Sequence, residues 1–178
     1  ALFMFHPVTT ERENIEKQAN ILIDALLEDK HNYVVIYPNN DMGSSTIIKA
    51  ISRLENNNKF RIFPSLRFEY FLTLLNNCQF IIGNSSAGIR EAPYYQKASV
   101  NLGNRQKNRA KSNSIINCNF DKIEIANAIK QSQNLIDFDS PSDFGQGKSD
   151  QLFYEIIKED SFWEVSCQKQ FKDKKLAD

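Results

Sequence analysis

The amino-acid sequence predicts an α/β fold, specifically a Rossmann-like doubly wound parallel sheet. Short continuous apolar runs such as "YVVIYP" alternate along the chain with segments whose apolar residues recur at helical spacing. Such alternation is typical of right-handed βαβ crossovers around a parallel sheet. The chain has 178 residues, of which 41% are hydrophobic, so it is long enough to build one domain with its own core.

The first strand and helix are predicted at the start of the chain. Residues 2–5 fit a buried strand, and Thr9 or Thr10 precedes a helical pattern over 11–30 that has an acidic first turn. The apolar positions of this helix are Ile15, Ala19, Leu22, Ile23 and Leu26.

The same strand-helix unit repeats through the middle of the chain. Residues 33–38, 60–66 and 79–83 fit strands. A helical pattern follows each of these strands, and it covers 68–77 after the strand at 60–66 and 85–95 after the strand at 79–83. The helix after the first of these strands carries Ile47, Ile48, Ile51 and Leu54 on its apolar side.

The last part of the chain continues the pattern and ends in a helical tail. Strands are predicted at 98–103 and 115–119, separated by the polar, basic loop 104–114, and a helix at 120–133. Residues 149–175 are helical in pattern. The apolar side of this tail comprises Leu152, Phe153, Ile156, Ile157 and Trp163.

Composition excludes several classes of function. Acidic and basic residues balance at 22 each, so no net field attracts nucleic acid or an anionic membrane. No apolar run approaches the roughly 20 residues of a membrane span. Cys78, Cys118 and Cys167 are odd in number and lack zinc-ligand spacing, which predicts neither a disulfide framework nor a zinc site and favours a cytoplasmic protein. His6 and His31 lie far apart in sequence, and no metal or other cofactor is expected.

The segment "FGQGKS" at 144–149 resembles a phosphate-binding P-loop, but its spacing is wrong. That loop requires a glycine five positions before its second glycine, and Ser142 occupies this position. No buried strand leads into the segment either. A glycine-rich turn is the better interpretation.

The segment "IIGNSSAGIREAP" at 81–93 is the best candidate for an anion site. Gly83 permits a sharp turn after a buried strand, and Asn84 is expected to cap a helix. Ser85 and Ser86 then place hydroxyl groups beside the free N–H groups of the first turn. From these residues alone an ordinary capped helix remains an equal alternative.

Glu91 and the other strand ends extend this candidate site. Glu91 is expected one and a half turns inside the helix, where it can accept hydrogen bonds from a ribose diol, although a solvent-facing charge is the alternative. Ligands of open α/β sheets bind at the carboxyl ends of the strands. The residues expected at the other strand ends are mostly polar or aromatic, and they are His6, Asn39, Leu66, Arg67, Phe68, Arg105 and Arg109.

Five motifs in family order make the sequence resemble the UDP-N-acetylglucosamine 2-epimerases. They are "HPVTTE", "YPNND" followed by Met-Gly-Ser, "FEYFLTLL", "IIGNSSAGIREAP" and "VNLGNRQKNR", and together they cover about residues 1–150. "HPVT" and "SSAGIRE" stand where the non-hydrolysing branch has motifs like "HRRE" and "DSGGIQE", so the resemblance points to the hydrolysing branch of sialic acid synthesis.

This resemblance implies a two-domain, glycosyltransferase-B-like protein of which residues 1–178 are the C-terminal, UDP-binding Rossmann-like domain, with terminal helices at 150–178. The chain opens on a strand without an initiator methionine, and we expect it to be a fragment that lacks the N-terminal catalytic half. The resemblance also implies that the full-length enzyme is a homo-oligomer.

The resemblance assigns the nucleotide contacts residue by residue. Ser85 and Ser86 are implied to hold the diphosphate of UDP, and Glu91 the ribose hydroxyls. Phe68 is implied to pack on the uracil ring while the backbone at Leu66 reads its edge. An aromatic ring for a base, hydroxyl and N–H groups for phosphate and a carboxylate for a diol are chemically suitable partners.

The remaining assignments concern the reacting end of a UDP-sugar ligand. Arg105 is implied to stand near the phosphates, and His6 and Asn39 to face the sugar-phosphate part of the cleft. The implied reaction is elimination of UDP followed by hydration to N-acetylmannosamine, with His6 as the candidate for assisting departure of UDP.

Three alternatives remain at the level of sequence. The substrate could be UDP-2,4-diacetamido-2,4,6-trideoxyglucose, on the route to legionaminic acid. A glycosyltransferase domain is disfavoured by the order of "NSSAGIRE" and "NLGNRQKNR". A non-catalytic nucleotide-sugar sensor is the alternative from a different class.

Overall fold

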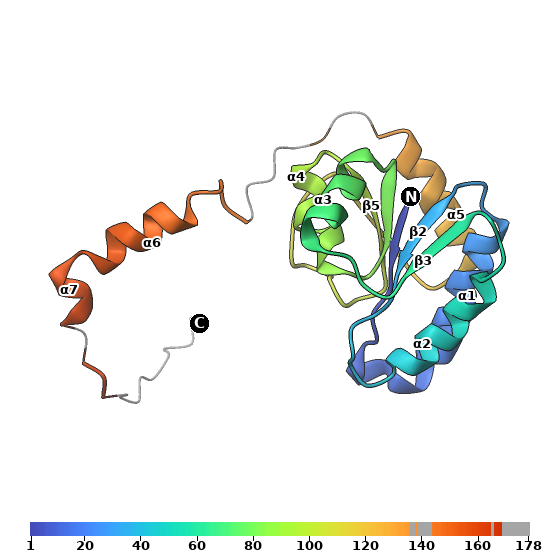
Figure 1. Cartoon of the computed structure of the whole chain (residues 1–178), viewed down its shortest axis with the longest axis horizontal. Coiled ribbons are helices and arrows are strands. Elements are labelled where there is room, and N and C mark those ends of the chain that lie inside the picture. The colour runs from blue at the N-terminus through green and yellow to red at the C-terminus, as the bar shows by residue number, and fades with distance from the viewer. Residues whose placement is uncertain (136–137, 139–143, 165, 169–178) are drawn as a thin grey trace, which may run out of the picture. The chain divides into compact units, whose positions relative to one another are not determined.

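Six parallel strands form a single sheet in the order β3-β2-β1-β4-β5-β6, as the computed structural model of the chain shows (Figure 1). The strands are β1 (Leu2–Met4), β2 (Tyr33–Ile36), β3 (Phe60–Phe63), β4 (Phe80–Gly83), β5 (Ala98–Leu102) and β6 (Ile115–Cys118). This confirms the predicted α/β class and all six predicted strands. The structure describes residues 1–135, 138, 144–164 and 166–168.

The direction in which successive strands are added to the sheet reverses at its centre. β1 pairs on both sides, with Phe3 opposite Val35 of β2 and opposite Ile82 of β4. Strands β2 and β3 extend the sheet in one direction from β1, and β4, β5 and β6 extend it in the other. Such a topological switch point leaves a crevice at the carboxyl ends of the two central strands, where ligands of this class of fold bind.

Three helices cover one face of the sheet: α1 (Ile15–Glu28), α2 (Ser44–Ile51) and α5 (Lys122–Gln133) (Figure 1). The apolar positions predicted for α1 are all buried against the sheet. The Asp121 side chain caps α5 by accepting hydrogen bonds from the backbone N–H groups of Ile123 and Glu124, both at 2.9 Å. This face contains the larger of the two apolar clusters.

The opposite face carries α3 (Phe68–Asn77), the short 3₁₀ turn η3 (Ser86–Gly88) and α4 (Glu91–Tyr94) (Figure 1). Helices on both faces confirm the doubly wound arrangement. A second apolar cluster joins these elements to the sheet, and it consists of Leu2, Ile36, Phe71, Leu75, Ile81, Ala87 and Ala92. Because α3 shares this cluster with η3 and α4, the segments after β3 and β4 lie on one continuous surface.

Two predicted helices are broken in the structure. The helix expected over 11–30 begins instead with the 3₁₀ turn η1 (Thr9–Asn14), because Glu11 departs from helical geometry with φ −120° and ψ 29°. The helix expected over 85–95 is not continuous, since only η3 and α4 form. A continuous helix needs an N–H at position 93, and Pro93 lacks one. The helix after β2 ends with the 3₁₀ turn η2 (Ser52–Leu54).

The chain divides into two units, Ala1–Asp143 and Phe144–Asp178. The second unit contains α6 (Ser149–Ile157) and α7 (Asp160–Trp163), while 165 and 169–175 of the predicted tail lie outside the described residues. Several apolar side chains of α6 and α7 are exposed, namely those of Leu152, Phe153, Tyr154, Ile156, Phe162 and Trp163. Within the described ranges no helix is long and apolar enough to cross a membrane.

Candidate functional site

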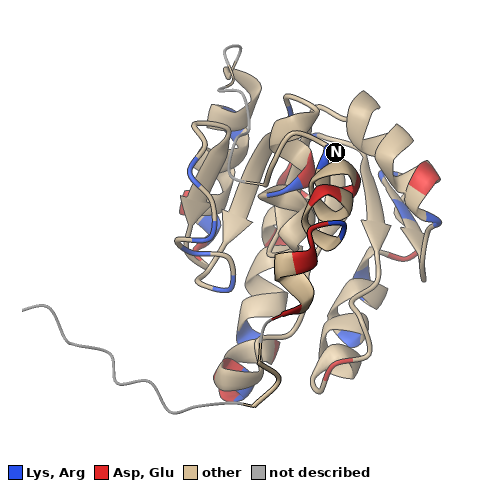
Figure 2. Ribbon diagram, turned by 90° about the vertical axis from the view of Figure 1, so that its left-hand side faces the viewer, with Lys and Arg blue, Asp and Glu red and all other residues tan. Residues whose placement is uncertain are grey.

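All eight predicted site residues follow the carboxyl ends of five strands. They are His6 after β1, Asn39 after β2, Leu66 and Phe68 after β3, Ser85, Ser86 and Glu91 after β4, and Arg105 after β5. Basic and acidic residues are interspersed over the rest of the chain (Figure 2). Anion binding therefore depends on the local donors at this edge rather than on a global field.

His6 and Asn39 are in direct contact although they follow different strands. The Nδ1 atom of His6 lies 3.1 Å from Oδ1 of Asn39 and 3.2 Å from its backbone N. Asn39 donates through Nδ2 to Asp41 Oδ2 at 2.6 Å, which turns its Oδ1 toward the imidazole. The Asn39 N–H can donate to Nδ1 only when Nδ1 carries no proton, whereas Oδ1 can accept only from a protonated Nδ1, so the two contacts belong to different protonation forms of the ring. Burial lowers the pKa of His6, and the charge of Arg105 acts in the same direction.

Asn84 does not cap a helix, contrary to the expectation from sequence. It is 1% exposed, and its side chain binds the main chain of His6. Its Oδ1 accepts from the N–H of His6 at 2.7 Å, and its Nδ2 donates to the carbonyl of His6 at 2.8 Å. The cap is supplied by Ser85, whose Oγ accepts from the N–H of Ala87 at 3.3 Å.

Arg105 is anchored to the same turn. Its Nη1 donates to the carbonyl of Asn84 at 3.0 Å, and Nε2 of the buried Gln106 donates to the same carbonyl at 3.0 Å. Oε1 of Gln106 accepts from Arg109 Nη1 at 3.0 Å. Burial lowers the pKa of Arg105, but the guanidinium keeps its charge at neutral pH because the ordinary pKa of arginine lies far above that range. This side of the crevice therefore carries a fixed positive charge.

The turn between β4 and η3 approaches β1 very closely. Gly83 has φ +137°, and a Cβ at this position would lie 1.8 Å from the carbonyl oxygen of Met4. Only glycine permits this path. The turn leaves the N–H groups of Ser85 and Ser86 and the Ser86 hydroxyl without a hydrogen-bond partner among the described residues. These groups are available to an anion, as separate donors rather than as the start of a long helix.

Glu91 opens α4 rather than lying within a helix as expected, because the chain breaks after η3. Its Oε2 atom is buried and has no hydrogen-bond partner among the described residues. A buried carboxylate oxygen without a donor costs free energy, so it is unusual in a folded protein. A ligand hydroxyl group at this position would remove that cost.

Phe68 and Leu66 follow β3, which is an edge strand of the sheet. Phe68 is the first residue of α3, is 59% exposed and stacks on Phe71 with ring centroids 6.3 Å apart. Leu66 is partly buried against the cluster that also holds η3 and α4. An exposed aromatic ring that is already oriented by a neighbour can receive a planar ligand group.

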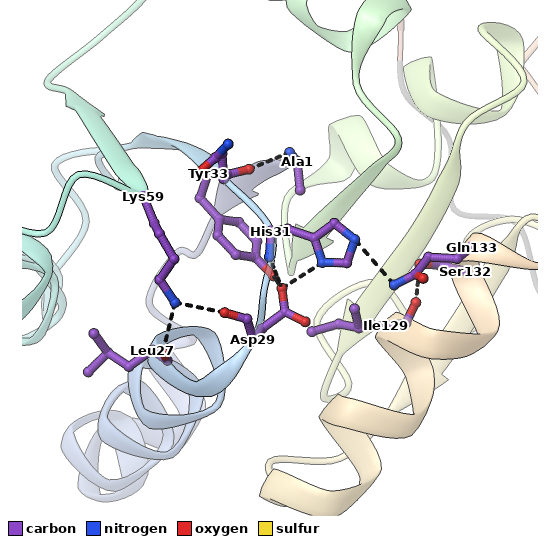
Figure 3. Close-up of polar contacts among 10 residues, drawn as sticks. Ala1, Leu27, Asp29, His31, Tyr33, Lys59, Ile129, Ser132 and Gln133 are labelled. Atoms are coloured by element: carbon purple, nitrogen blue, oxygen red, sulfur yellow. Dashed lines mark hydrogen bonds and ion pairs between the residues drawn. The ribbon is translucent and has the colours of Figure 1, made fainter.

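A second polar cluster lies at the opposite, amino edge of the sheet (Figure 3). Asp29 Oδ2 lies 2.6 Å from His31 Nδ1 and 2.7 Å from Tyr33 Oη, and His31 Nε2 contacts Gln133 Nε2 at 3.2 Å. Burial favours a raised pKa for Asp29, but hydrogen bonds from Tyr33 and His31 outweigh it and the pKa falls. Every ring nitrogen and hydroxyl of this cluster has a partner, so it fixes the turn between α1 and β2 rather than presenting a reactive group.

No group of three or more His, Cys, Asp or Glu side chains in the described ranges is arranged to hold a metal ion. Burial raises the pKa of Cys118 to about 12, with Glu124 acting in the same direction. Cys78 is also shifted upward by burial. These two thiols are therefore poor nucleophiles at neutral pH.

Comparison with known proteins identifies the family. The family model of UDP-N-acetylglucosamine 2-epimerase matches residues 1–158. The chain belongs to the UDP-N-acetylglucosamine 2-epimerase family. It is 43% identical over 176 residues to the UDP-N-acetylglucosamine 2-epimerase of Neisseria meningitidis serogroup B, covering 97% of this chain and 46% of that protein.

A second curated relative has a lower sequence identity to this chain. The UDP-N,N'-diacetylbacillosamine 2-epimerase (hydrolyzing) of Legionella pneumophila is 29% identical over 88% of this chain and 42% of its own length. The chain thus spans about half the length of the curated relatives it matches, and corresponds to the C-terminal half of the meningococcal one.

Solved epimerase structures share the fold. The Methanocaldococcus jannaschii UDP-GlcNAc 2-epimerase in complex with UDP-GlcNAc and UDP superposes with a TM-score of 0.70 at 18% identity, over 88% of this chain and 44% of that one. The Neisseria meningitidis UDP-GlcNAc 2-epimerase bound to UDP-GlcNAc gives a TM-score of 0.66 at 13% identity, over 88% of this chain and 44% of that one. The fold is therefore one Rossmann-like half of a glycosyltransferase-B-type epimerase.

Sequence reasoning missed two residues of this candidate site. Asn84 was expected to cap a helix, and Gln106 was not singled out. Both are among the few buried polar residues of the chain, at 1% and 2% exposure. The only signal in the sequence was their position directly beside Ser85 and Arg105.

Proposed function

We propose that the chain is the UDP-binding half of a hydrolysing UDP-N-acetylglucosamine 2-epimerase, which converts UDP-N-acetylglucosamine and water to UDP and N-acetylmannosamine for sialic-acid-type sugar synthesis. The observation that carries the proposal is the set of unpaired donors and acceptors around the switch point. Ser85 and Ser86 offer free donors there, Arg105 a guanidinium and Glu91 a buried oxygen without a partner. Family membership and the 43% identical meningococcal relative support the assignment.

A nucleoside diphosphate matches these groups in order along the edge. Phe68 and Leu66 would take the uracil, Glu91 the ribose diol, and Ser85, Ser86 and Arg105 the diphosphate. The apolar cluster shared by α3, η3 and α4 makes the surface continuous from the base end to the phosphate end. Two structural neighbours are described as bound to UDP-GlcNAc, which supports a ligand of this class.

The proposed reaction begins with elimination. The proton at C2 of the sugar leaves to a base, a double bond forms between C1 and C2, and the C1–O bond breaks with its electron pair going to the diphosphate. Water then adds across the double bond, with its hydroxyl at C1 and a proton at C2. This chain contributes to departure of UDP, because Arg105 and the free N–H donors stabilise negative charge that grows on the diphosphate.

His6 has a second part in this step. Burial and Arg105 keep the free imidazole neutral, but the negative charge of a bound diphosphate raises its affinity for a proton. Protonated His6, with Nδ1 held by Asn39, could then donate from Nε2 to the leaving phosphate. The base for the C2 proton is assigned to the other half of the protein, so the isolated chain is expected not to release N-acetylmannosamine.

Calorimetry with UDP tests the proposal. The chain is expected to bind UDP, and Ser86→Ala to weaken binding about tenfold through loss of a hydrogen bond to a charged group. Ser52→Ala, which removes a hydroxyl bound to Lys49 O at the end of α2, is the matched control and should leave affinity unchanged. Absence of UDP binding at millimolar concentration would refute the proposal.

A related substrate is the second candidate. The Legionella relative is named a UDP-N,N'-diacetylbacillosamine 2-epimerase, although it is 29% identical rather than 43%. The groups assigned to this chain hold the nucleotide, which both substrates share. Product analysis of the full-length protein with each UDP-sugar separates the two.

A further inference from the structure

Asn84 is unusually connected for a residue in a turn. It is 1% exposed, whereas amide side chains are mostly found at protein surfaces. Its backbone N donates to Met4 O at 3.2 Å, its amide makes two hydrogen bonds to the His6 main chain, and its carbonyl accepts from Arg105 and Gln106. All polar atoms of the residue are therefore engaged.

These bonds cross the switch point of the sheet. His6 follows β1 and precedes Asn84 by 78 residues, while Arg105 follows β5 and lies 21 residues after it. β1 and β5 flank β4, so Asn84 bridges three adjacent strand ends. The bonds continue outward, from His6 to Asn39 on one side and from Gln106 to Arg109 on the other.

We propose that Asn84 is a positioning residue of the leaving-group site, which holds the His6 main chain and the Arg105 side chain in one rigid frame. The inference rests on the proposed function, in which both residues face the diphosphate. With its N–H and carbonyl both fixed, His6 retains freedom only in its side-chain torsions. Groups held in advance lose less entropy when a ligand binds and meet the developing charge without rearrangement.

The two halves of this frame can be separated by mutation. Asn84→Ala deletes both bonds to His6 but keeps the carbonyl that receives Arg105 and Gln106. Gln106→Met has the opposite effect, because it removes the bonds to the Asn84 carbonyl and to Arg109 while the Asn84 side chain is intact. The first variant is expected to perturb His6, and the second the Asn84 carbonyl that receives Arg105.

The chain contains only two histidines, so side-chain NMR reports on His6 directly with His31 as an internal reference. In the unsubstituted chain we expect the pKa of His6 to lie below its ordinary value, with Nδ1 in contact with Asn39. In Asn84→Ala its pKa should move toward the ordinary value and the ratio of its tautomers should change, while the His31 signals stay in place. UDP affinity should fall about tenfold, as two hydrogen bonds next to the phosphate site are lost. Gln106→Met should lower UDP affinity with the His6 signals unchanged.

Asn101→Ala is the matched control. Asn101 lies on β5, is 2% exposed and donates to Asn117 Oδ1 at 2.7 Å, so the variant loses a comparable buried amide bond outside the site. It should alter neither the His6 signals nor UDP affinity. If Asn84→Ala does not fold, Asn84→Asp keeps the volume and the acceptor for the His6 N–H, and it should also move the His6 signals.

The inference is overturned if folded Asn84→Ala or Asn84→Asp has the same His6 titration as the unsubstituted chain and a UDP affinity within twofold of it. It is also overturned if Asn101→Ala changes the His6 signals and the UDP affinity as much as Asn84→Ala does. Failure of the unsubstituted chain to bind UDP would count against the proposed function instead. The His6 signals recorded without UDP would still decide the role of Asn84.

Discussion

Glu91→Gln should weaken UDP binding while leaving the free chain at least as stable as before. Oε2 of Glu91 is buried without a hydrogen-bond partner, and burial of an unpaired carboxylate oxygen opposes folding. Replacing the carboxylate by an isosteric amide reduces this cost, because a neutral amide is less unfavourable to bury than a carboxylate. A residue retained at a cost to stability is expected where a ligand supplies the missing partner.

The size of the effect follows from the bond that the ligand would supply. A hydrogen bond to a charged acceptor contributes about 1.5–3 kcal/mol, and each 1.4 kcal/mol corresponds to about tenfold in affinity. Glu91→Gln exchanges a charged acceptor for a neutral one, so we expect the lower end of this range, about a tenfold loss.

Calorimetry with UDP and with 2′,3′-dideoxy-UDP isolates this bond. The unsubstituted chain should prefer UDP by about tenfold, and Glu91→Gln should lose most of that preference, because the carboxylate and the ribose hydroxyls act as a coupled pair. Glu69→Gln removes an exposed carboxylate from the first turn of α3 and serves as the control. The reasoning is refuted if Glu91→Gln unfolds at lower denaturant and keeps the full preference for UDP, since Glu91 would then have a structural role.

Three further outcomes follow from the structure. Phe68→Ala should weaken UDP binding about tenfold through loss of aromatic stacking, with little change in stability. Tyr70 is equally exposed, at 59%, on the same helix, and Tyr70→Ala should change neither UDP affinity nor stability. Equal effects of the two variants in calorimetry would argue against a base-stacking role for Phe68. Gly83→Ala should lower the free energy of unfolding by about 4 kcal/mol or more, because the new Cβ would lie 1.8 Å from Met4 O and must separate β1 from β4. A decrease under about 1 kcal/mol in denaturant unfolding would contradict this packing. Because the pKa of His6 is lowered in the native state, the unfolded state binds more protons than the native state below pH 6.5. The stability that His6 contributes is therefore complete above that pH and is lost as pH falls. Denaturation midpoints measured from about pH 8 to 5 should decline less steeply in His6→Gln than in the unsubstituted chain, and parallel profiles would exclude this contribution.

Much of the fold could be read from periodicity. The helix predicted at 68–77 coincides with α3, and each strand was placed to within a few residues, because buried runs and helical spacing are properties of neighbouring residues. The prediction was wrong where a local detail interrupted the pattern. Pro93 prevents a continuous helix over 85–95, and the non-helical Glu11 delays the start of α1 to Ile15.

For the site, the sequence by itself determined which residues follow each strand, since this depends only on order along the chain. The strand order decided which of them meet. His6 and Asn84 are 78 residues apart and become partners because β1 and β4 are neighbours, with the switch point between them. Packing likewise leaves a buried oxygen of Glu91 without a partner among the described residues. Packing also directs the Asn84 side chain to the main chain of His6, so that it does not cap a helix. Hydrogen-bond satisfaction depends on neighbours in space, which the local pattern of residues does not specify.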